Sequence, residues 1–342
     1  MRVILVSTAV PVMYGGARFI VDWLELVLKQ YGHQVETVYL PAVDHSDTRY
    51  FEQMLNFRLC NLAEFADRII TFRPPSHMVQ HPCKVMWFIH HLRVFYDVWH
   101  VYRPVPDTAY WRAYRARLMA ADRVALSEAH RVFTNSLTVS ERVKNFNGVD
   151  TEVLYPPLMN PERFYFDSYG DEIVCVCRFE HHKRQYLLAE AMRHVRTPVR
   201  LRLCGASTEA LARVEAVAEE IPAGRVTIEA RWISEEEKAE RLASALAIAY
   251  VPIEEDGYGY PVLEAAHARK ASIVTDDGGA VREFVRDGVE GFVLPPDPKA
   301  IAEIFDRLWS DRKLAARLGD GAAARIDELG IGWPRVVERL LS

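Results

Sequence analysis

The sequence is poor in cysteine, carries little net charge and contains no long apolar run. It has five cysteines in 342 residues, and none forms the C-x-x-C pair or histidine grouping that marks a zinc site. A formal net charge of -5 argues against broad binding to nucleic acid. No segment approaches the ~20 apolar residues that a transmembrane helix needs. We therefore expect a cytoplasmic protein, and localisation at the inner face of the membrane is the alternative.

Short apolar runs alternate with amphipathic segments along almost the whole chain. The runs are typical of buried parallel strands, and the first, at residues 2–7, is followed by a glycine turn rather than by a signal-peptide cleavage site. A proline-rich stretch at residues 151–164 separates two such series. The chain is also long for a single hydrophobic core. The sequence therefore predicts an α/β fold with two domains, each built on a parallel sheet with covering helices.

The segment at residues 251–265, VPIEEDGYGYPVLEA, carries the strongest functional signal. A strand runs into a turn with Gly257 and Gly259, and Pro261 suits the first turn of a helix because its missing N–H needs no partner there. The free N–H groups at such a helix start favour an anion, most often phosphate. Asp256 and Glu264 flank this position and are better suited to accept hydroxyl groups. The pattern indicates a nucleotide sugar, and a capped helix with solvated acids is the simpler alternative.

The same segment resembles the E-x7-E motif of family-4 glycosyltransferases, which are retaining enzymes of the GT-B fold. The resemblance implies that Asp256 holds hydroxyls of the donor sugar, as a catalytic residue, and that Glu264 holds the ribose. It also implies donor contacts from the turn between the two acids, at Gly257, Tyr258, Gly259, Tyr260 and Pro261. The first acid is one methylene shorter than in the family, so Glu254 and Glu255 remain alternatives for the sugar contact.

The sequence after this motif extends the resemblance. A β-rich run at residues 272–275 meets Gly278 and Gly279, and a short helix with Glu283 follows. Glycine lets the backbone approach a ligand closely, so this pair is expected beside the donor sugar. A glycine pair alone is common in turns, but its spacing after the first motif is similar to that of the family.

Two cations lie upstream, after the apolar run that begins at Ile173. Cations at the carboxyl end of a strand can meet a diphosphate at the crevice of an open α/β sheet. The resemblance implies that Arg178 and Lys183 neutralise the departing diphosphate and are catalytic. Taken singly, such residues are usually solvated surface charges.

Several further donor contacts are implied by the resemblance alone. They lie in a glycine turn after the first strand, at the end of a strand of the second domain and in a loop beside the base: Gly15, Gly16, Gly205, Arg231 and Trp232. In that loop the backbone can supply the contact, and a buried tryptophan is the usual alternative.

Two histidines end an apolar strand in the first domain, where the resemblance places a catalytic histidine near the reacting bond. Alternate residues of a strand face opposite sides, so only one of His90 and His91 can point towards a ligand. We favour His91. A core histidine bonded to the backbone is the alternative for either residue.

An aromatic and basic segment lies between Arg93 and Arg123. It contains Tyr96, Trp99, Tyr102, Tyr110, Trp111 and Tyr114 together with Arg112, Arg115 and Arg117. The helical spacing predicts a packed helix with a solvated basic face. Contact with the acceptor or with a membrane surface is the alternative.

Together these features predict the GT-B fold, with two Rossmann-like, doubly wound domains facing a central cleft. We expect an acceptor-side domain at residues 1–157, a nucleotide-sugar-binding domain at 158–325 and, at 326–342, a C-terminal helix that crosses back to the N-terminal domain. The expected function is retaining transfer of a sugar from a nucleoside-diphosphate sugar to a hydroxyl of a glycan, lipid-linked glycan or small-molecule acceptor. It would need no metal ion and no cofactor. A GT-B-fold phosphorylase, a sugar-nucleotide epimerase and a non-catalytic nucleotide-sugar-binding subunit are the alternatives.

Overall fold

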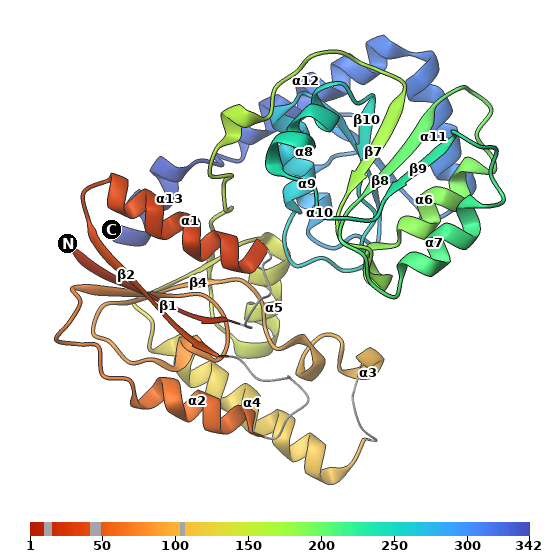
Figure 1. The fold of residues 1–342 in the computed structure, drawn as a ribbon. Helices are drawn as coiled ribbons and strands as arrows, with labels where there is room; N and C mark the ends of the chain where they lie inside the picture. Colours follow the sequence, from red (N-terminus) through yellow and green to blue (C-terminus); the bar gives the residue numbers. More distant parts are fainter. Residues whose placement is uncertain (10–15, 42–48, 103–106) are drawn as a thin grey trace. The chain divides into compact units, whose positions relative to one another are not determined.

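The computed structural model describes residues 1–9, 16–41, 49–102 and 107–342. The chain forms two compact units (Figure 1). The first comprises Met1–Pro156 together with Gly332–Ser342, and the second comprises Pro157–Ile331. The second unit is therefore inserted between the body of the first unit and its last helix.

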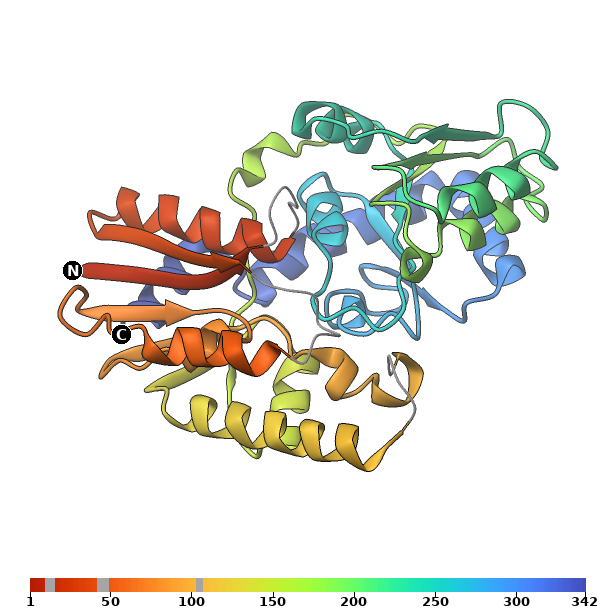
Figure 2. The same ribbon diagram turned by 60° about the horizontal axis from the view of Figure 1, so that its bottom comes forward.

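The first unit is built on a six-stranded parallel sheet with the order β2-β1-β3-β4-β5-β6. Its strands are β1 (Arg2–Ala9), β2 (Gln34–Pro41), β3 (Arg68–Thr71), β4 (Lys84–Phe88), β5 (Arg131–Thr134) and β6 (Glu152–Val153). Its helices are α1 (Gly16–Gln30), α2 (Tyr50–Leu59), α3 (Trp99–Tyr102), α4 (Ala109–Ser127), α5 (Leu137–Asn147) and α13 (Trp333–Leu341). Helix α1 lies on one face of the sheet, and α2 and α4 lie on the other (Figure 2).

The second unit repeats this design with the strand order β12-β11-β10-β7-β8-β9. Its strands are β7 (Glu172–Val176), β8 (Arg200–Cys204), β9 (Val226–Glu229), β10 (Ala247–Ala249), β11 (Ala271–Thr275) and β12 (Gly291–Leu294). Its helices are α6 (Gln185–Met192), α7 (Leu211–Ala218), α8 (Glu235–Ala243), α9 (Tyr260–His267), α10 (Val281–Phe284), α11 (Pro298–Ser310) and α12 (Arg312–Glu328). The strand order reverses at β7, and ligands of open α/β sheets bind at the carboxyl ends of strands at such a switch point.

Local sequence signals explain where several helices begin and end. Helix α5 begins after Ser136, whose hydroxyl accepts a hydrogen bond from the Val139 N–H, and it ends at Gly148 with φ of 71°. Ser234 and Glu237 form a reciprocal capping box at the start of α8. These caps satisfy backbone groups that the helices leave without partners.

Helix α13 belongs to the first unit, as the prediction of a helix crossing back to that domain requires. Arg68 donates a hydrogen bond of 2.8 Å from Nη1 to the Leu340 carbonyl, and Arg339 forms an ion pair with Glu152. The predicted GT-B architecture of two doubly wound parallel sheets is confirmed. The sequence did not predict α2, and α4, the helix of the aromatic and basic segment, continues to Ser127.

Candidate active site in the second unit

Three strands of the second sheet end beside one another, and each is followed by residues of the predicted donor site. Strand β7 lies between β10 and β8, and β10 also pairs with β11. Arg178 and Lys183 follow β7, the acidic loop and α9 follow β10, and the glycine pair follows β11. Because the strands are parallel, their carboxyl ends share one edge of the sheet. The fold therefore brings these sequence motifs to one place.

Lys183 lies at the centre of this edge. Its Nζ donates hydrogen bonds to the Tyr250 hydroxyl at 2.7 Å and to Glu255 Oε2 at 2.5 Å. Burial opposes ionisation of Glu255, but the charge and hydrogen bond of Lys183 outweigh it, so the pKa of this carboxyl is lowered. The carboxylate that contacts Lys183 is thus Glu255, the residue before Asp256, and Asp256 is half-buried.

The glycine pair holds the acidic loop from the β11 side. The Glu255 N–H donates to the Gly278 carbonyl at 3.2 Å, and the Glu255 carbonyl accepts from the Ala280 N–H at 2.9 Å. Gly279 has φ of +65°, and a Cβ there would lie 2.5 Å from the Glu255 carbonyl oxygen. A side chain at this position would therefore force the loop away from the turn. The structure assigns Gly279 to supporting the loop.

Arg184 is a buried anchor that the sequence analysis missed. Its guanidinium donates to the carbonyls of Val251 and Pro252 and, at 2.6 and 2.7 Å, to the two carboxylate oxygens of Asp277. Burial opposes ionisation of Asp277, but Arg184 outweighs it and the pKa is lowered. Arg184 thus ties the β7 side of the site to the two neighbouring loops. The run of basic residues at 181–184 was the available signal, but only Lys183 was singled out.

Arg178 is more exposed than Lys183. Its side chain is 44% exposed and forms an ion pair with Glu180 at 2.9 Å. His182 also reaches Glu180, with Nε2 and Oε2 3.3 Å apart. Arg178 lies on the same loop as Lys183 without contacting it, so the structure offers two separately held cations after β7.

The second acid of the motif, Glu264, is buried on α9. Its Oε1 accepts a hydrogen bond of 2.6 Å from Lys238 Nζ. Burial raises the pKa of Glu264, and the charge of Lys238 opposes this rise. Pro261 lies in the first turn of α9, as predicted, after Gly259 with φ of 80°. A Cβ at Gly259 would lie 2.5 Å from the Tyr250 ring, so close packing also requires glycine here.

The tyrosines of the turn differ in their surroundings. Tyr258 is buried, with its ring centroid 6.0 Å from that of Phe284, so its ring is part of the packing rather than a surface for the donor. Tyr260 is half-buried at the start of α9, and Gly257 is half-buried beside Asp256.

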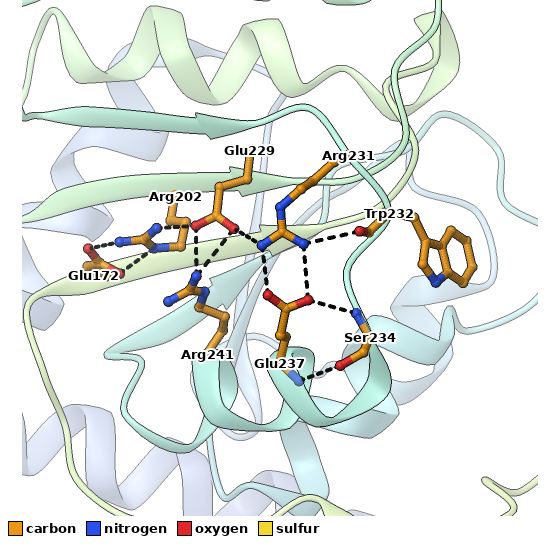
Figure 3. A network of polar contacts seen from close by, with 8 residues as sticks. All are labelled: Glu172, Arg202, Glu229, Arg231, Trp232, Ser234, Glu237 and Arg241. Atoms are coloured by element: carbon orange, nitrogen blue, oxygen red, sulfur yellow. Dashed lines mark hydrogen bonds and ion pairs between the residues drawn. The ribbon is translucent and has the colours of Figure 1, made fainter.

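The residues after β8 and β9 form a separate part of the site. A Cβ at Gly205 would lie 2.0 Å from the Cys177 carbonyl oxygen, so glycine permits the close approach of β8 to the end of β7. Arg231 pairs with Glu237 at 2.7 Å and with Glu229 at 3.6 Å (Figure 3). The Trp232 ring points away from this network and is 61% exposed (Figure 3). The expectation of a buried tryptophan is thus excluded, and Arg231 is held by carboxylates.

In the first unit, the two histidines lie in different surroundings. His91 is 1% exposed, and its Nε2 lies 2.7 Å from Asn147 Oδ1. Burial lowers its pKa to about 4, despite the hydrogen bond to Asn147. The preference for His91 as the ring that faces a ligand is therefore corrected: it is a core histidine, packed against Tyr96 and Phe88. His90 is the half-buried member of the pair.

The remaining predicted residues of the first unit are less informative. Gly15 lies outside the described residues, and Gly16 is an exposed residue that begins α1. The aromatic segment is largely packed: Trp99 and Tyr114 are buried, and the Arg115 guanidinium lies 5.4 Å from the centre of the Trp99 ring. Tyr110 remains exposed. These contacts agree with the interpretation of a packed helix.

The described residues contain neither a candidate metal site nor a candidate membrane span. No group of three or more His, Cys, Asp or Glu side chains in that part of the chain is arranged to hold a metal ion. None of the helices described is both long and apolar enough to cross a bilayer.

The fold matches those of glycosyltransferases of the GT-B class. Sucrose-phosphate synthase from Thermosynechococcus elongatus superposes with a TM-score of 0.76 at 18% identity, covering 98% of this chain and 97% of that chain. HepE of Anabaena, solved with UDP and glucose, gives a TM-score of 0.69 at 14% identity, with 98% and 99% covered. The lipopolysaccharide outer core galactosyltransferase WaaB gives 0.68 at 15% identity, with 96% and 95% covered. The protein has the GT-B fold.

The sequence of the second unit identifies it more closely. Residues 163–325 match the model of the family described as glycosyl transferases group 1. No curated protein matches the sequence. The second unit is therefore similar to a group 1 glycosyl transferase domain, and the protein is a glycosyltransferase.

Proposed function

We propose that the protein is a retaining glycosyltransferase that uses a nucleoside-diphosphate sugar and needs no metal ion. One observation carries the proposal. Lys183 lies at the carboxyl edge of the second sheet, hydrogen-bonded to the acidic loop that leads into α9. Cations, a helix start and the acids Asp256 and Glu264, which all follow neighbouring strands of this sheet, suit a ligand with a central diphosphate and hydroxyls at both ends.

The chemistry follows from the charge that develops as the donor breaks. The bond from the anomeric carbon to the diphosphate oxygen breaks, and negative charge builds on the leaving phosphate. Lys183, Arg178 and the N–H groups at the start of α9 would stabilise that charge, and such preorganised donors are often the largest catalytic contribution. The acceptor hydroxyl attacks on the face from which the diphosphate leaves, and the phosphate takes its proton. The anomeric configuration is thereby retained.

Glu255 would compete with the donor diphosphate for Lys183. In the free protein it neutralises Lys183. A diphosphate that approaches Lys183 therefore meets a cation that already has an anionic partner. We expect Lys183 to exchange part of its contact with Glu255 for the phosphate, and Asp256 or the displaced Glu255 to accept a sugar hydroxyl.

The known structures support the choice of substrates. HepE was also solved with UDP-glucose, and TarM of S. aureus was solved as the G117R variant with fondaparinux, α-GlcNAc-glycerol and UDP. UDP is therefore the first donor nucleotide to test, and glycan or lipid-linked hydroxyls are the first acceptors. We propose a role in polysaccharide biosynthesis in the cytoplasm, at the inner face of the membrane if the acceptor is lipid-linked.

A thermal-shift titration tests the donor site first. UDP, GDP, dTDP, CDP and ADP, and their common sugar conjugates, are added with and without EDTA, because ligands that bind the folded state raise its melting temperature. A shift with one nucleotide that survives EDTA supports the proposal. No shift from any of them in a folded sample contradicts it and favours a non-catalytic subunit. With the donor known, NMR of the product's anomeric proton tests retention, and inversion would exclude the proposed mechanism.

The same assays separate the two enzymatic alternatives. A phosphorylase releases sugar phosphate when inorganic phosphate is supplied, and an epimerase converts the nucleotide sugar without any acceptor. Either result would replace transfer as the function while leaving the donor site in place.

A further inference from the structure

Lys238 links α8 to the buried acid of the donor motif. Its Nζ lies 2.6 Å from Glu264 Oε1 and 2.9 Å from Glu235 Oε1. The side chains of Lys238 and Glu264 are 12% and 6% exposed, whereas that of Glu235 is 41% exposed. The ammonium also lies 5.6 Å from the centre of the Phe164 ring. The contact with Glu264 is therefore an internal ion pair and not a surface one.

Only one oxygen of Glu264 is occupied by this contact. Within the part of the chain that the structure describes, Oε2 makes no hydrogen bond, and Lys238 is the sole side-chain partner of the carboxylate. An ionised carboxylate can accept about four hydrogen bonds through its two oxygens. Glu264 thus retains acceptor capacity for a ligand while one oxygen is fixed.

Hydrogen bonds of neighbouring residues fix the start of the helix that carries Lys238. Lys238 follows the capping box of Ser234 and Glu237 on α8, and Glu237 also receives a two-pronged contact from Arg231 (Figure 3). Burial lowers the pKa of Lys238, but the two carboxylates outweigh it and raise the pKa above its usual value. Lys238 is therefore a charged group near the capped start of α8, in contact with a buried acid.

We propose that Lys238 is a positioning residue for nucleotide recognition: it holds one oxygen of Glu264 so that the carboxylate accepts hydrogen bonds from the ribose hydroxyls. The inference rests on the proposed function, in which Glu264 binds the ribose. It adds a residue outside the motif that acts through Glu264. Without Lys238, burial favours the protonated acid, which is a weaker acceptor because charge-assisted hydrogen bonds are about twice as strong as neutral ones.

The test compares ribose recognition in matched variants of the full chain. Calorimetry measures the affinity for UDP, GDP, CDP or ADP, whichever gives the largest thermal shift, and for its 2′,3′-dideoxy counterpart. The ratio of the two affinities reports the ribose contact alone. We expect wild type to prefer the ribonucleotide by roughly 10-fold or more, as for hydrogen bonds to a charged group. Lys238→Met and Glu264→Gln should both bring the ratio close to one.

Two controls separate positioning from general damage. Lys238→Arg keeps the charge and should keep the preference, and Lys299→Met removes an exposed lysine of α11 and should leave it unchanged. If Lys238→Met does not fold, Lys238→Gln is measured instead.

The outcomes distinguish the two levels of the proposal. If Glu264→Gln loses the ribose preference and Lys238→Met keeps it, the role of Lys238 is refuted and the donor site stands. If wild type shows no preference, or Glu264→Gln retains it, the ribose contact itself is refuted and the inference falls with it. Turnover of the Arg178 and Lys183 variants then tests the diphosphate site separately.

Discussion

Two lysine–glutamate pairs of the second unit have similar geometry and different expected roles. Lys183 and Glu255 are 2.5 Å apart, and Lys238 and Glu264 are 2.6 Å apart. Burial is the largest single influence on both carboxyls. The contacts of Glu255 together outweigh burial and lower its pKa, whereas Lys238 does not outweigh it and the pKa of Glu264 is raised. In the first pair the lysine is the proposed ligand of the donor, and in the second the glutamate is. In the proposed function, the contact of Glu255 with Lys183 competes with the donor diphosphate. The contact of Lys238 with Glu264 instead holds the carboxylate that accepts the ribose hydroxyls.

Among the variants considered, removal of the Lys183 side chain should have the largest effect on catalysis. We expect Lys183→Ala to lower kcat by about 10²–10³-fold, because one preorganised donor to the developing charge is lost. Arg178→Ala should have a smaller effect, since its side chain is more exposed. Steady-state transfer assays check this, with Arg193→Ala as a control for an exposed arginine after α6. Unchanged turnover in Lys183→Ala would refute the diphosphate role.

The backbone contact of Gly279 with the loop that carries Glu255 can be disturbed without changing Lys183 or Glu255. Gly279→Ala places a Cβ in a left-handed residue and against the Glu255 carbonyl, so we expect a loss of at least ~2 kcal/mol in the free energy of unfolding. Gly288→Ala is the matched control, because Gly288 has φ of +74° with nothing within 4 Å of the added Cβ. Denaturant unfolding of both variants measures the difference. Equal losses would mean that backbone strain alone matters and that the loop contact does not.

Neutralising the two acids should have opposite effects on nucleotide affinity. Glu255→Gln removes the anion that competes for Lys183, so the nucleoside diphosphate should bind several-fold tighter. Glu264→Gln removes the acceptor of the ribose, so it should bind roughly 10-fold more weakly. Calorimetry with the same nucleotide checks both variants. A loss of affinity in both would mean that Glu255 helps to hold the donor and does not compete with it.

Lys270, a third lysine of the second unit, shows how burial changes the pKa of a lysine that has no close carboxylate partner. Lys270 is buried between the rings of Phe166 and Tyr169 and donates to the Ser168 carbonyl. Burial lowers its pKa from 10.5 to about 7, against a weak opposing effect of Asp167. Between these two pH values the unfolded chain binds the extra proton, so the stability contributed by Lys270 rises with pH, by at most ~1.4 kcal/mol per unit.

Lys270→Met tests this smallest effect. The free energy of unfolding of wild type, relative to that of the variant, should increase from pH 7 to pH 9, and below pH 7 the difference should level off. Denaturant unfolding at four pH values is sufficient. A pH-independent difference would mean that Lys270 keeps its charge in the folded protein.

The sequence predicted the fold and the donor motifs because both depend on local patterns. Apolar runs located the strands, and glycines with Pro261 located the start of α9. The partners of these residues could not be predicted. Glu255 lies 72 residues from Lys183, and Lys238 lies in a run of glutamates that is typical of a solvated helix face. His91 was misplaced because the alternation of a strand does not say which face is buried.

The insertion of the second unit has a consequence for synthesis of the protein. A ribosome completes the second unit, Pro157–Ile331, before it has made α13, which belongs to the first unit. Until then the first unit lacks its 11 residues Gly332–Ser342. Arg68 of β3 and Glu152 of β6 therefore lack the partners that α13 provides. A chain that stops before Gly332 would thus keep every residue of the second unit and lose the helix that completes the first unit.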